Sequence, residues 1–280
     1  MNENINKTIL LCIAFIFCKV QCIHAVTARP YEFNLFLGGS YYIGDLNPVG
    51  HFNSFTKPAG GIGFRYNYNT RFAVRINIFS GSVQGDDLQS SSLGQKQRKL
   101  NFKSPISEYS FQGEFNFLDY RMNSPHKFFS TYAFLGIGGF KFKPQGEING
   151  VWQELQPLST EGQGTSANPG SKQYKLFQVA IPFGVGFKLN LSEKIDLALE
   201  WGMRKTFTDY LDDVSTVYPD PAILTSEKGT IAAVYSDRSG VSNNVGRQRG
   251  NSKNKDWYCF SGVVLGFRFR EPAQKCPALE

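Results

Sequence analysis

Apolar and polar residues alternate with a period of two along many segments of this 280-residue chain. In residues 195–204, IDLALEWGMR, every second residue is apolar and the residues between are small or charged. Alternation of this kind predicts a β-strand with one apolar face, and a water-soluble antiparallel sheet also shows it. Here it recurs about eight times, mostly with Phe, Leu, Val and Ile opposite charged, amide or small residues. That recurrence is typical of a β-barrel with lipid outside and a polar interior.

We therefore predict an all-β fold, a transmembrane antiparallel up-and-down barrel of about eight strands. The expected strands are residues 31–42, 60–68, 72–78, 107–119, 127–143, 174–190, 195–204 and 257–270. Three glycines, at 136, 138 and 139, leave the facing of the fifth strand open. Pro182 lies in the middle of the sixth strand and has no amide hydrogen, so we expect a bulge or a locally open pairing there.

The connections between these strands alternate in length. Residues 69–70, 121–126 and 191–193 form short turns, whereas residues 43–59, 81–106, 144–173 and 205–256 form long polar loops. Outer-membrane barrels have short periplasmic turns and long extracellular loops. A soluble lipocalin-like barrel would reverse the two faces, with apolar residues lining a cavity. The regular pairing of aromatic faces with Arg and Glu favours lipid on the outside and an outer-membrane location.

The first residues have the features of an export signal. Lys7 is followed by a short apolar run, Ile9–Phe17, and Ala25 or Ala28 suits a cleavage site. We divide the chain into a signal peptide at 1–25, a barrel at 26–270 and a periplasmic tail at 271–280. Cleavage after residue 25 leaves 28 basic and 22 acidic residues, a net charge of +6. This dispersed surplus does not fit a nucleic-acid binder.

The polar faces gather many charges inside the predicted barrel. The inward set is Glu32, Arg65, Arg75, Glu108, Glu114, Lys188, Asp196, Glu200, Arg204 and Arg268. An eight-stranded barrel is only just wide enough for its own side chains, so charges confined there must pair. We expect ion pairs to plug the lumen and hold the barrel together, without a conducting pore.

Few residues suggest catalysis or metal binding. Only His51 and His126 remain after cleavage of the signal, at opposite ends of the barrel, so no Ser-His-Asp set is expected. Cys and His are too sparse for a metal centre, and we expect no cofactor. The acidic run at 206–215 carries Asp209, Asp212 and Asp213, which suit a hard cation, but its spacing is not that of a calcium loop. A structural role at the end of the seventh strand is favoured.

Two cysteines remain in the mature chain, Cys259 and Cys276. The strand from Cys259 to Arg270 spans about 36 Å, whereas bridged Cα atoms lie within about 7 Å, so the two should not bond to each other. Cys276 is then a free thiol in an oxidising compartment. It is a candidate partner-binding residue through an intermolecular disulfide, and an inert thiol is the alternative.

Two segments carry a resemblance to a known family. Residues 36–46, FLGGSYYIGDL, and residues 200–215, EWGMRKTFTDYLDDVS, are similar to the outer-membrane barrel family that includes PorG, a component of type IX secretion. The second segment is the more specific one. Its motif residues are Thr206, Asp209, Tyr210, Asp212 and Asp213. The resemblance implies a non-enzymatic barrel that anchors the periplasmic ring of the lipoprotein PorK and its partner PorN to the outer membrane.

Three functions follow as hypotheses. The first is a type IX secretion scaffold that contacts outer-membrane lipid and binds periplasmic ring proteins through its turns and tail. The second is a stand-alone surface barrel whose long loops bind an external ligand. The third, a lipid-modifying enzyme, would depend on His51 as the one loop-side candidate.

Overall fold

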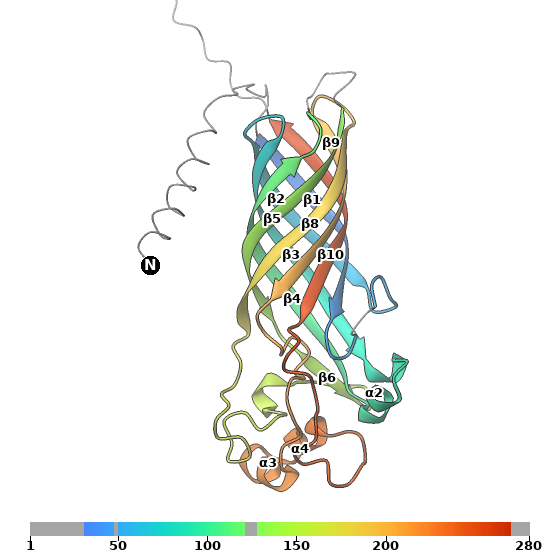
Figure 1. The fold of residues 1–280 in the computed structure, drawn as a ribbon, viewed down its shortest axis with the longest axis vertical. Helices are drawn as coiled ribbons and strands as arrows, with labels where there is room; N and C mark the ends of the chain where they lie inside the picture. The colour runs from blue at the N-terminus through green and yellow to red at the C-terminus, as the bar shows by residue number, and fades with distance from the viewer. Residues whose placement is uncertain (1–30, 48–49, 121–127, 270–280) are drawn as a thin grey trace, which may run out of the picture.

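Eight long strands close into an antiparallel barrel in the computed structural model, which describes residues 31–47, 50–120 and 128–269. The barrel strands are β1 (Tyr31–Ile43), β2 (Lys57–Asn67), β3 (Phe72–Asp86), β4 (Asn101–Asn116), β5 (Phe129–Phe142), β8 (Phe177–Asn190), β9 (Ile195–Thr206) and β10 (Trp257–Phe269). Each barrel strand pairs with the next one along the chain, and β1 pairs with β10 to close the barrel (Figure 1). The predicted fold class is confirmed.

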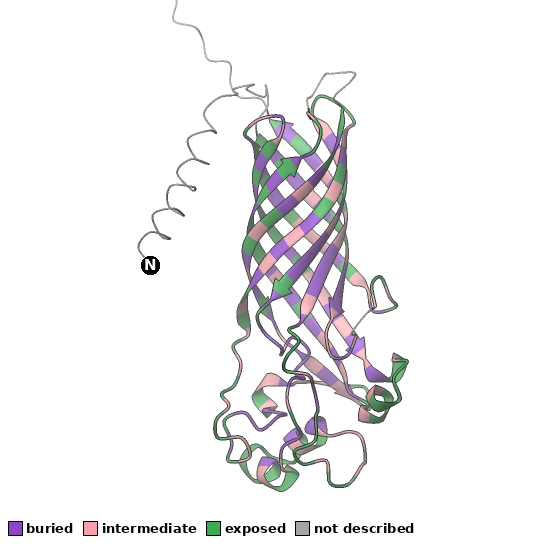
Figure 2. Cartoon of the chain, viewed as in Figure 1, coloured by how far each residue is buried: buried purple, intermediate pink, exposed green. Residues whose placement is uncertain are grey.

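The exterior of the barrel is apolar. Outward side chains such as Leu37, Ile76 and Leu135 are 58%, 58% and 63% exposed, and exposed and buried residues alternate along the strands (Figure 2). Apolar exposure on this scale in water would drive association, whereas in a bilayer it is the lipid-facing surface. The barrel therefore spans a membrane, and barrels of this architecture belong to outer membranes. No helix within the described ranges combines the length and apolar character that a membrane span requires.

β3 and β4 are longer than the sequence predicts. They pair without interruption from Phe72↔Phe115 to Asp86↔Asn101, so the connection is residues 87–100 and the expected loop at 81–106 is wrong. Most outward residues of this extension are polar, among them Ser82 and Lys103. Because these pairs lack an apolar outer face, the period-two pattern that marks the other strands is lost there.

Pro182 interrupts one of its two ladders. Between β5 and β8, Leu135↔Phe183 and Gly138↔Ala180 share one register, and the two pairs between them are missing. On the other side, Pro182 pairs with Arg204 of β9 in an unbroken ladder. The structure thus has the locally open pairing expected of a residue without an amide hydrogen, and no bulge.

The lumen is filled by two layers of side chains. Charged residues fill the half near the short turns, and an apolar layer fills the half near the long loops. The apolar layer includes Phe36, Tyr42, Phe79, Phe102, Phe140, Phe142, Tyr258 and Phe260. An entirely polar interior, as the sequence suggested, is wrong for this half. The outward neighbours of these aromatic residues are often apolar as well, so alternation does not reveal them.

The long connections fold into a cap at one end of the barrel (Figure 1). They contain η2 (Asp87–Gln89), α2 (Leu93–Arg98), β6 (Gln145–Ile148), β7 (Val151–Glu154), η3 (Gln156–Leu158), α3 (Pro221–Lys228) and α4 (Thr230–Ser236). β6 and β7 form a hairpin attached to β4 through Lys103↔Gln145. The sequence predicted only long polar loops in these segments, and neither the hairpin nor the helices.

Candidate functional site in the sealed lumen and its cap

All ten charged residues assigned to the lumen from the sequence lie inside the barrel, each at most 7% exposed. They come from seven of the eight barrel strands, because inward positions recur at every second residue. Eight of them form one connected set of ion pairs, with four carboxylates and four cations: Glu32, Arg65, Arg75, Glu114, Lys188, Asp196, Glu200 and Arg268. The charges of this set cancel.

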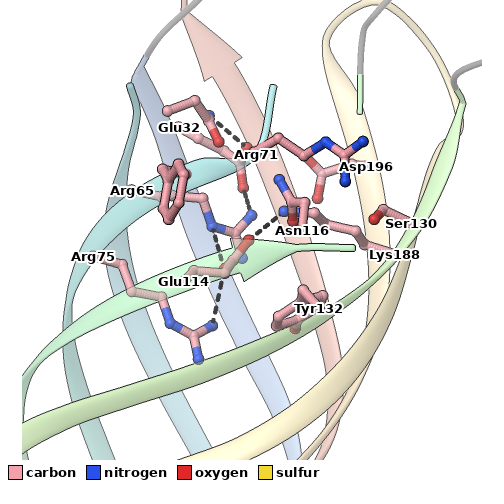
Figure 3. A network of polar contacts seen from close by, with 12 residues as sticks. Glu32, Arg65, Arg71, Arg75, Glu114, Asn116, Ser130, Tyr132, Lys188 and Asp196 are labelled. Carbon is pink, nitrogen blue, oxygen red and sulfur yellow. Dashed lines mark hydrogen bonds and ion pairs between the residues drawn. The ribbon is translucent and has the colours of Figure 1, made fainter. Parts of the chain in front are cut away.

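Glu114 is at the centre of the network (Figure 3). Its carboxylate pairs with Lys188, and its Oε2 lies 3.2 Å from Nε of Arg65 and 3.9 Å from Nη1 of Arg75. Three cations from three strands thus converge on one buried carboxylate. Removing any partner leaves buried charge without compensation, which costs several kcal/mol.

From Glu114 the network continues in two directions, toward the short turns and toward the middle of the barrel. Near the short turns, Arg268 joins Glu32 at 3.0 Å to Asp196 at 2.9 Å. Toward the middle, Nη1 of Arg75 lies 2.6 Å from Glu200, and its guanidinium stacks 4.5 Å from the ring centroid of Phe134. Ion pairs and rings together occupy the space that a pore would need.

A separate ion pair lies within the apolar layer. Nε of Arg204 donates to Glu108 at 2.9 Å, and the hydroxyl of Tyr258 donates to the same carboxylate at 2.9 Å. The Arg204 guanidinium lies between two rings, 5.1 Å from Phe79 and 4.8 Å from Phe260. A charge placed between aromatic faces gains cation–π stabilisation where water is excluded.

We call the region where β9 and β10 meet the cap the neck. It carries carboxyls that share one phenol. The hydroxyl of Tyr42 donates to Asp212 and lies 3.2 Å from Oδ1 of Asp256. The amide of Leu211 donates to the other oxygen of Asp256 at 2.8 Å. Burial and the neighbouring carboxylate of Asp45 raise the pKa of Asp212 well above the usual range. Burial and the carboxylate of Asp212 do the same to the pKa of Asp256. Each of these carboxyls therefore binds a proton more readily than an isolated one.

The five motif residues lie in this neck and in the base of the cap. Thr206 donates to the carbonyl of Asp256 at 2.6 Å, and Asp213 accepts from Thr160 and Tyr174. The ring of Tyr210 stacks on Tyr174 with centroids 4.6 Å apart. Asp209 and Asp212 are 3% and 1% exposed. The motif therefore builds the base of the cap, and its acids are inaccessible to a partner protein.

Glu161 and Arg249 hold the cap together. The Glu161 carboxylate accepts from the amides of Ser215 and Thr216, at 2.8 and 3.1 Å, and from Nη1 of Arg249 at 3.1 Å. Arg249 also donates to the carbonyl of Asp213 at 2.5 Å and to that of Ser236 at 3.0 Å. From the sequence, Arg249 lies in the long polar loop at 205–256, and none of these contacts was predicted. Isolated charges in polar loops carry no periodic pattern that would reveal these partners.

The groups considered for chemistry do not come together. Nδ1 of His51 lies 2.9 Å from the hydroxyl of Tyr41, which also accepts from Trp201 at 2.9 Å, on the outer wall of the barrel. Within the described ranges, no cluster of three or more His, Cys, Asp or Glu is arranged to hold a metal ion. Cys259 is buried and free. His126 and Cys276, the signal peptide and the tail lie outside the described residues.

Comparisons with known proteins identify a family and similar folds. A family model described as "Domain of unknown function (DUF6089)" matches residues 8–225. No curated protein matches the chain.

Among solved structures, Ail of Yersinia pestis is 10% identical over 87% of this chain and 100% of its own, with a TM-score of 0.41. Neisserial surface protein A is 8% identical over 85% and 97%, with a TM-score of 0.39. The outer membrane protein OprG of Pseudomonas aeruginosa is 11% identical over 87% and 99%, with a TM-score of 0.34. Identities this low carry no information about activity or partners.

Proposed function

The chain belongs to the DUF6089 family, and we propose that it is a non-enzymatic outer-membrane barrel that serves as a scaffold in type IX secretion. In this role it anchors a periplasmic ring of the PorK and PorN type to the outer membrane. The filled lumen is the observation that carries the proposal, because ion pairs and aromatic rings occupy the barrel from the Glu32 level to the Tyr258 level. A barrel without a pore acts through its surfaces.

The resemblance of residues 200–215 to the PorG family supports the secretion role. Because the motif carboxyls are buried in the neck, they fit a structural role in building the cap better than a contact with ring proteins. The proposed contact with the ring is therefore at the opposite end, the end of the short turns, where β10 ends and the tail at 271–280 follows in the sequence. The Arg71–Asp119 ion pair lies at this end, with side chains 42% and 39% exposed.

The test is co-purification from detergent-solubilised membranes of the native bacterium. Tagged protein should recover the periplasmic ring proteins, and a variant lacking residues 271–280 should recover less of them. Arg247→Gln, an exposed change in the cap, is the matched control and should recover them fully. Failure of the wild-type protein to recover ring proteins, with secretion intact after deletion of its gene, would contradict the proposal.

We further propose that the thiol of Cys276 forms an intermolecular disulfide with a thiol of a ring lipoprotein, with the two protons and two electrons of the thiols passing to the thiol-oxidising machinery of the periplasm. The Cys259 thiol is buried in the barrel wall, so Cys276 is the thiol of the mature chain that the link would use. Cys276→Ser should abolish a non-reducing crosslinked band, and Cys259→Ser should leave it. A crosslink pattern that is the same in Cys276→Ser and wild type rules out the link.

The second candidate is a surface barrel that binds an external ligand through its loops. The ordered cap favours this second candidate, because buried hydrogen bonds of Glu161 and Arg249 hold the loops in one conformation. Shortening the segment at 239–248 separates the two candidates. Loss of ligand binding with normal secretion supports the surface barrel. Loss of secretion with an assembled ring does not support the surface barrel.

A further inference from the structure

A small polar pocket opens in the cap, between α2 and the segment that leads from α4 to β10. Its volume is about 140 Å³. The lining consists of Gly94, Gln97, Arg98, Tyr218, Ser239, Val241, Asn244, Arg247 and Gln248. Ligand pockets for drug-sized molecules occupy about 300–1,000 Å³, so this one suits a single small group, either free or projecting from a larger molecule.

Tyr218 is the buried polar side chain of this pocket. It is 7% exposed, and its hydroxyl has no hydrogen-bond partner among the residues that the structure describes. The backbone fixes it in place, since its amide donates to Arg247 at 3.0 Å and its carbonyl accepts from Gly246 at 2.9 Å. A hydroxyl whose proton no protein group accepts is free to donate to an oxygen of a ligand in the pocket. Burial raises the pKa of this phenol, so it remains a donor at neutral pH.

The charges around the pocket favour an anion. Two of the lining residues are arginines, Arg98 and Arg247, and none is acidic. The charge of Arg98 is balanced by its ion pair with Asp87, so Arg247 supplies the uncompensated positive charge. The nearby carboxylates are engaged within the cap. Asp87 accepts from Nε and Nη2 of Arg98 at 2.8 and 2.7 Å, and Asp237 accepts from Ser239 at 2.7 Å and Asn244 at 2.8 Å. The exposed guanidinium of Arg247 makes no described ion pair and keeps its donors for a ligand.

We propose that this pocket binds an oxyanion, namely a carboxylate, sulfate or phosphate group, with Tyr218 and Arg247 as its principal donors. Tyr218 supplies one O–H donor from a buried side chain, and Arg247 supplies a planar pair of N–H donors from an exposed one, the kind of donor set that oxyanions accept. Gln97 and Gln248, which also line the pocket, carry amides that can add neutral donors. The inference is independent of the secretion role and holds for any ligand that carries such a group.

Isothermal titration calorimetry on the mature protein in detergent tests the proposal. Sodium phosphate, sulfate and acetate are titrated separately, with chloride keeping the ionic strength constant. Wild-type protein should bind at least one of them saturably in the millimolar range. Tyr218→Phe, which removes only the hydroxyl, and Arg247→Gln should each weaken that binding about tenfold. Lys253→Gln, an exposed change in the same segment outside the pocket, is the control and should bind like wild type.

Two results would overturn the proposal. One is the absence of saturable binding of all three anions to the wild-type protein. The other is binding that falls equally in Lys253→Gln and in Arg247→Gln, which would assign it to the general positive charge of the segment. Circular dichroism spectra that coincide with wild type show that the variants are folded. Because no ring protein takes part, failure of this experiment leaves the proposed secretion role standing.

Discussion

Lys188 of β8 forms an ion pair with Glu114 of β4 across the lumen, and both side chains are fully buried. β5 lies between these two strands in the sheet, so the contact joins strands that share no backbone hydrogen bonds. The lumen network thus joins strands that are not neighbours, and the ion pair between Arg75 of β3 and Glu200 of β9 joins strands on opposite sides of the barrel.

Lys188→Met should destabilise the barrel. Methionine keeps most of the volume but leaves Glu114 with less positive charge in a dry interior, and breaking a buried pair costs about 3–5 kcal/mol. Urea unfolding in detergent, followed by tryptophan fluorescence, measures the loss. Lys194→Met, in an exposed short turn, is the control and should change the unfolding free energy by less than about 0.5 kcal/mol. Equal stability of the two variants would contradict a structural role for the network.

The barrel should not conduct ions. Purified protein in planar lipid bilayers is expected to show no stable single-channel steps, because side chains fill both halves of the lumen. The double variant Arg75→Ala, Glu200→Ala removes both members of an ion pair in which Nη1 of Arg75 lies 2.6 Å from Glu200, without changing the net charge of the lumen. This variant should show brief openings. Stable conductance of the wild-type protein would show that the network opens.

The cap should be more stable in mild acid than at alkaline pH. Burial raises the pKa of Asp213 from 3.8 to about 6 and that of Asp209 to about 6. A carboxyl with a higher pKa in the folded state favours folding when protonated. Its contribution is fully present below pH 3.8 and is lost as the pH rises through about 6.

For Asp213 the full shift corresponds to about 3 kcal/mol, at about 1.4 kcal/mol for each pH unit. At pH 5, one unit below the folded pKa of about 6, about 1.4 kcal/mol of this contribution remains, and at pH 8 it is lost. Cleavage of the cap by chymotrypsin at pH 5 and pH 8, scaled by the activity of the protease on an unfolded substrate, measures it. Asp213→Asn should reduce the difference between the two pH values. A cap that resists cleavage better at pH 8 than at pH 5 would contradict the assignment.

Arg249→Gln should loosen the cap without unfolding the barrel. The change leaves the buried carboxylate of Glu161 without its cation and removes donors to two carbonyls. Hydrogen exchange of residues 210–216 should become at least about tenfold faster, with barrel strands unchanged. Arg247→Gln, two residues away and exposed, should exchange like wild type. Unchanged exchange in Arg249→Gln would show that other contacts hold the cap.

The barrel follows from the sequence because its physical signal is local. A residue such as Val185 or Lys188 faces lipid or lumen according to its parity along the strand, and β8 shows the predicted facing throughout. The same parity places the lumen charges together in space. Parity alone does not give the position of each charge along the barrel axis or its partners. These depend on the register between strands, since partners such as Glu114 and Lys188 are 74 residues apart.

The cap could not be predicted because its contacts are not periodic. Glu161 and Arg249 are 88 residues apart, in segments without alternation, and nothing local marks them as partners. The inward aromatic layer was missed for a related reason. At Phe79, between Ile78 and Ser80, apolar residues follow one another, and a run of this kind does not show which of them faces the lumen.

Site-directed spin labelling tests the orientation of the barrel wall most directly. In a background with Cys259→Ser and Cys276→Ser, labels at Ile76 and Leu135 should collide with oxygen dissolved in the bilayer and be shielded from a water-soluble nickel complex. A label at exposed Lys253 in the cap should show the reverse. Nickel accessibility at Ile76 and Leu135 equal to that at Lys253 would contradict a barrel with lipid outside and charges sealed within.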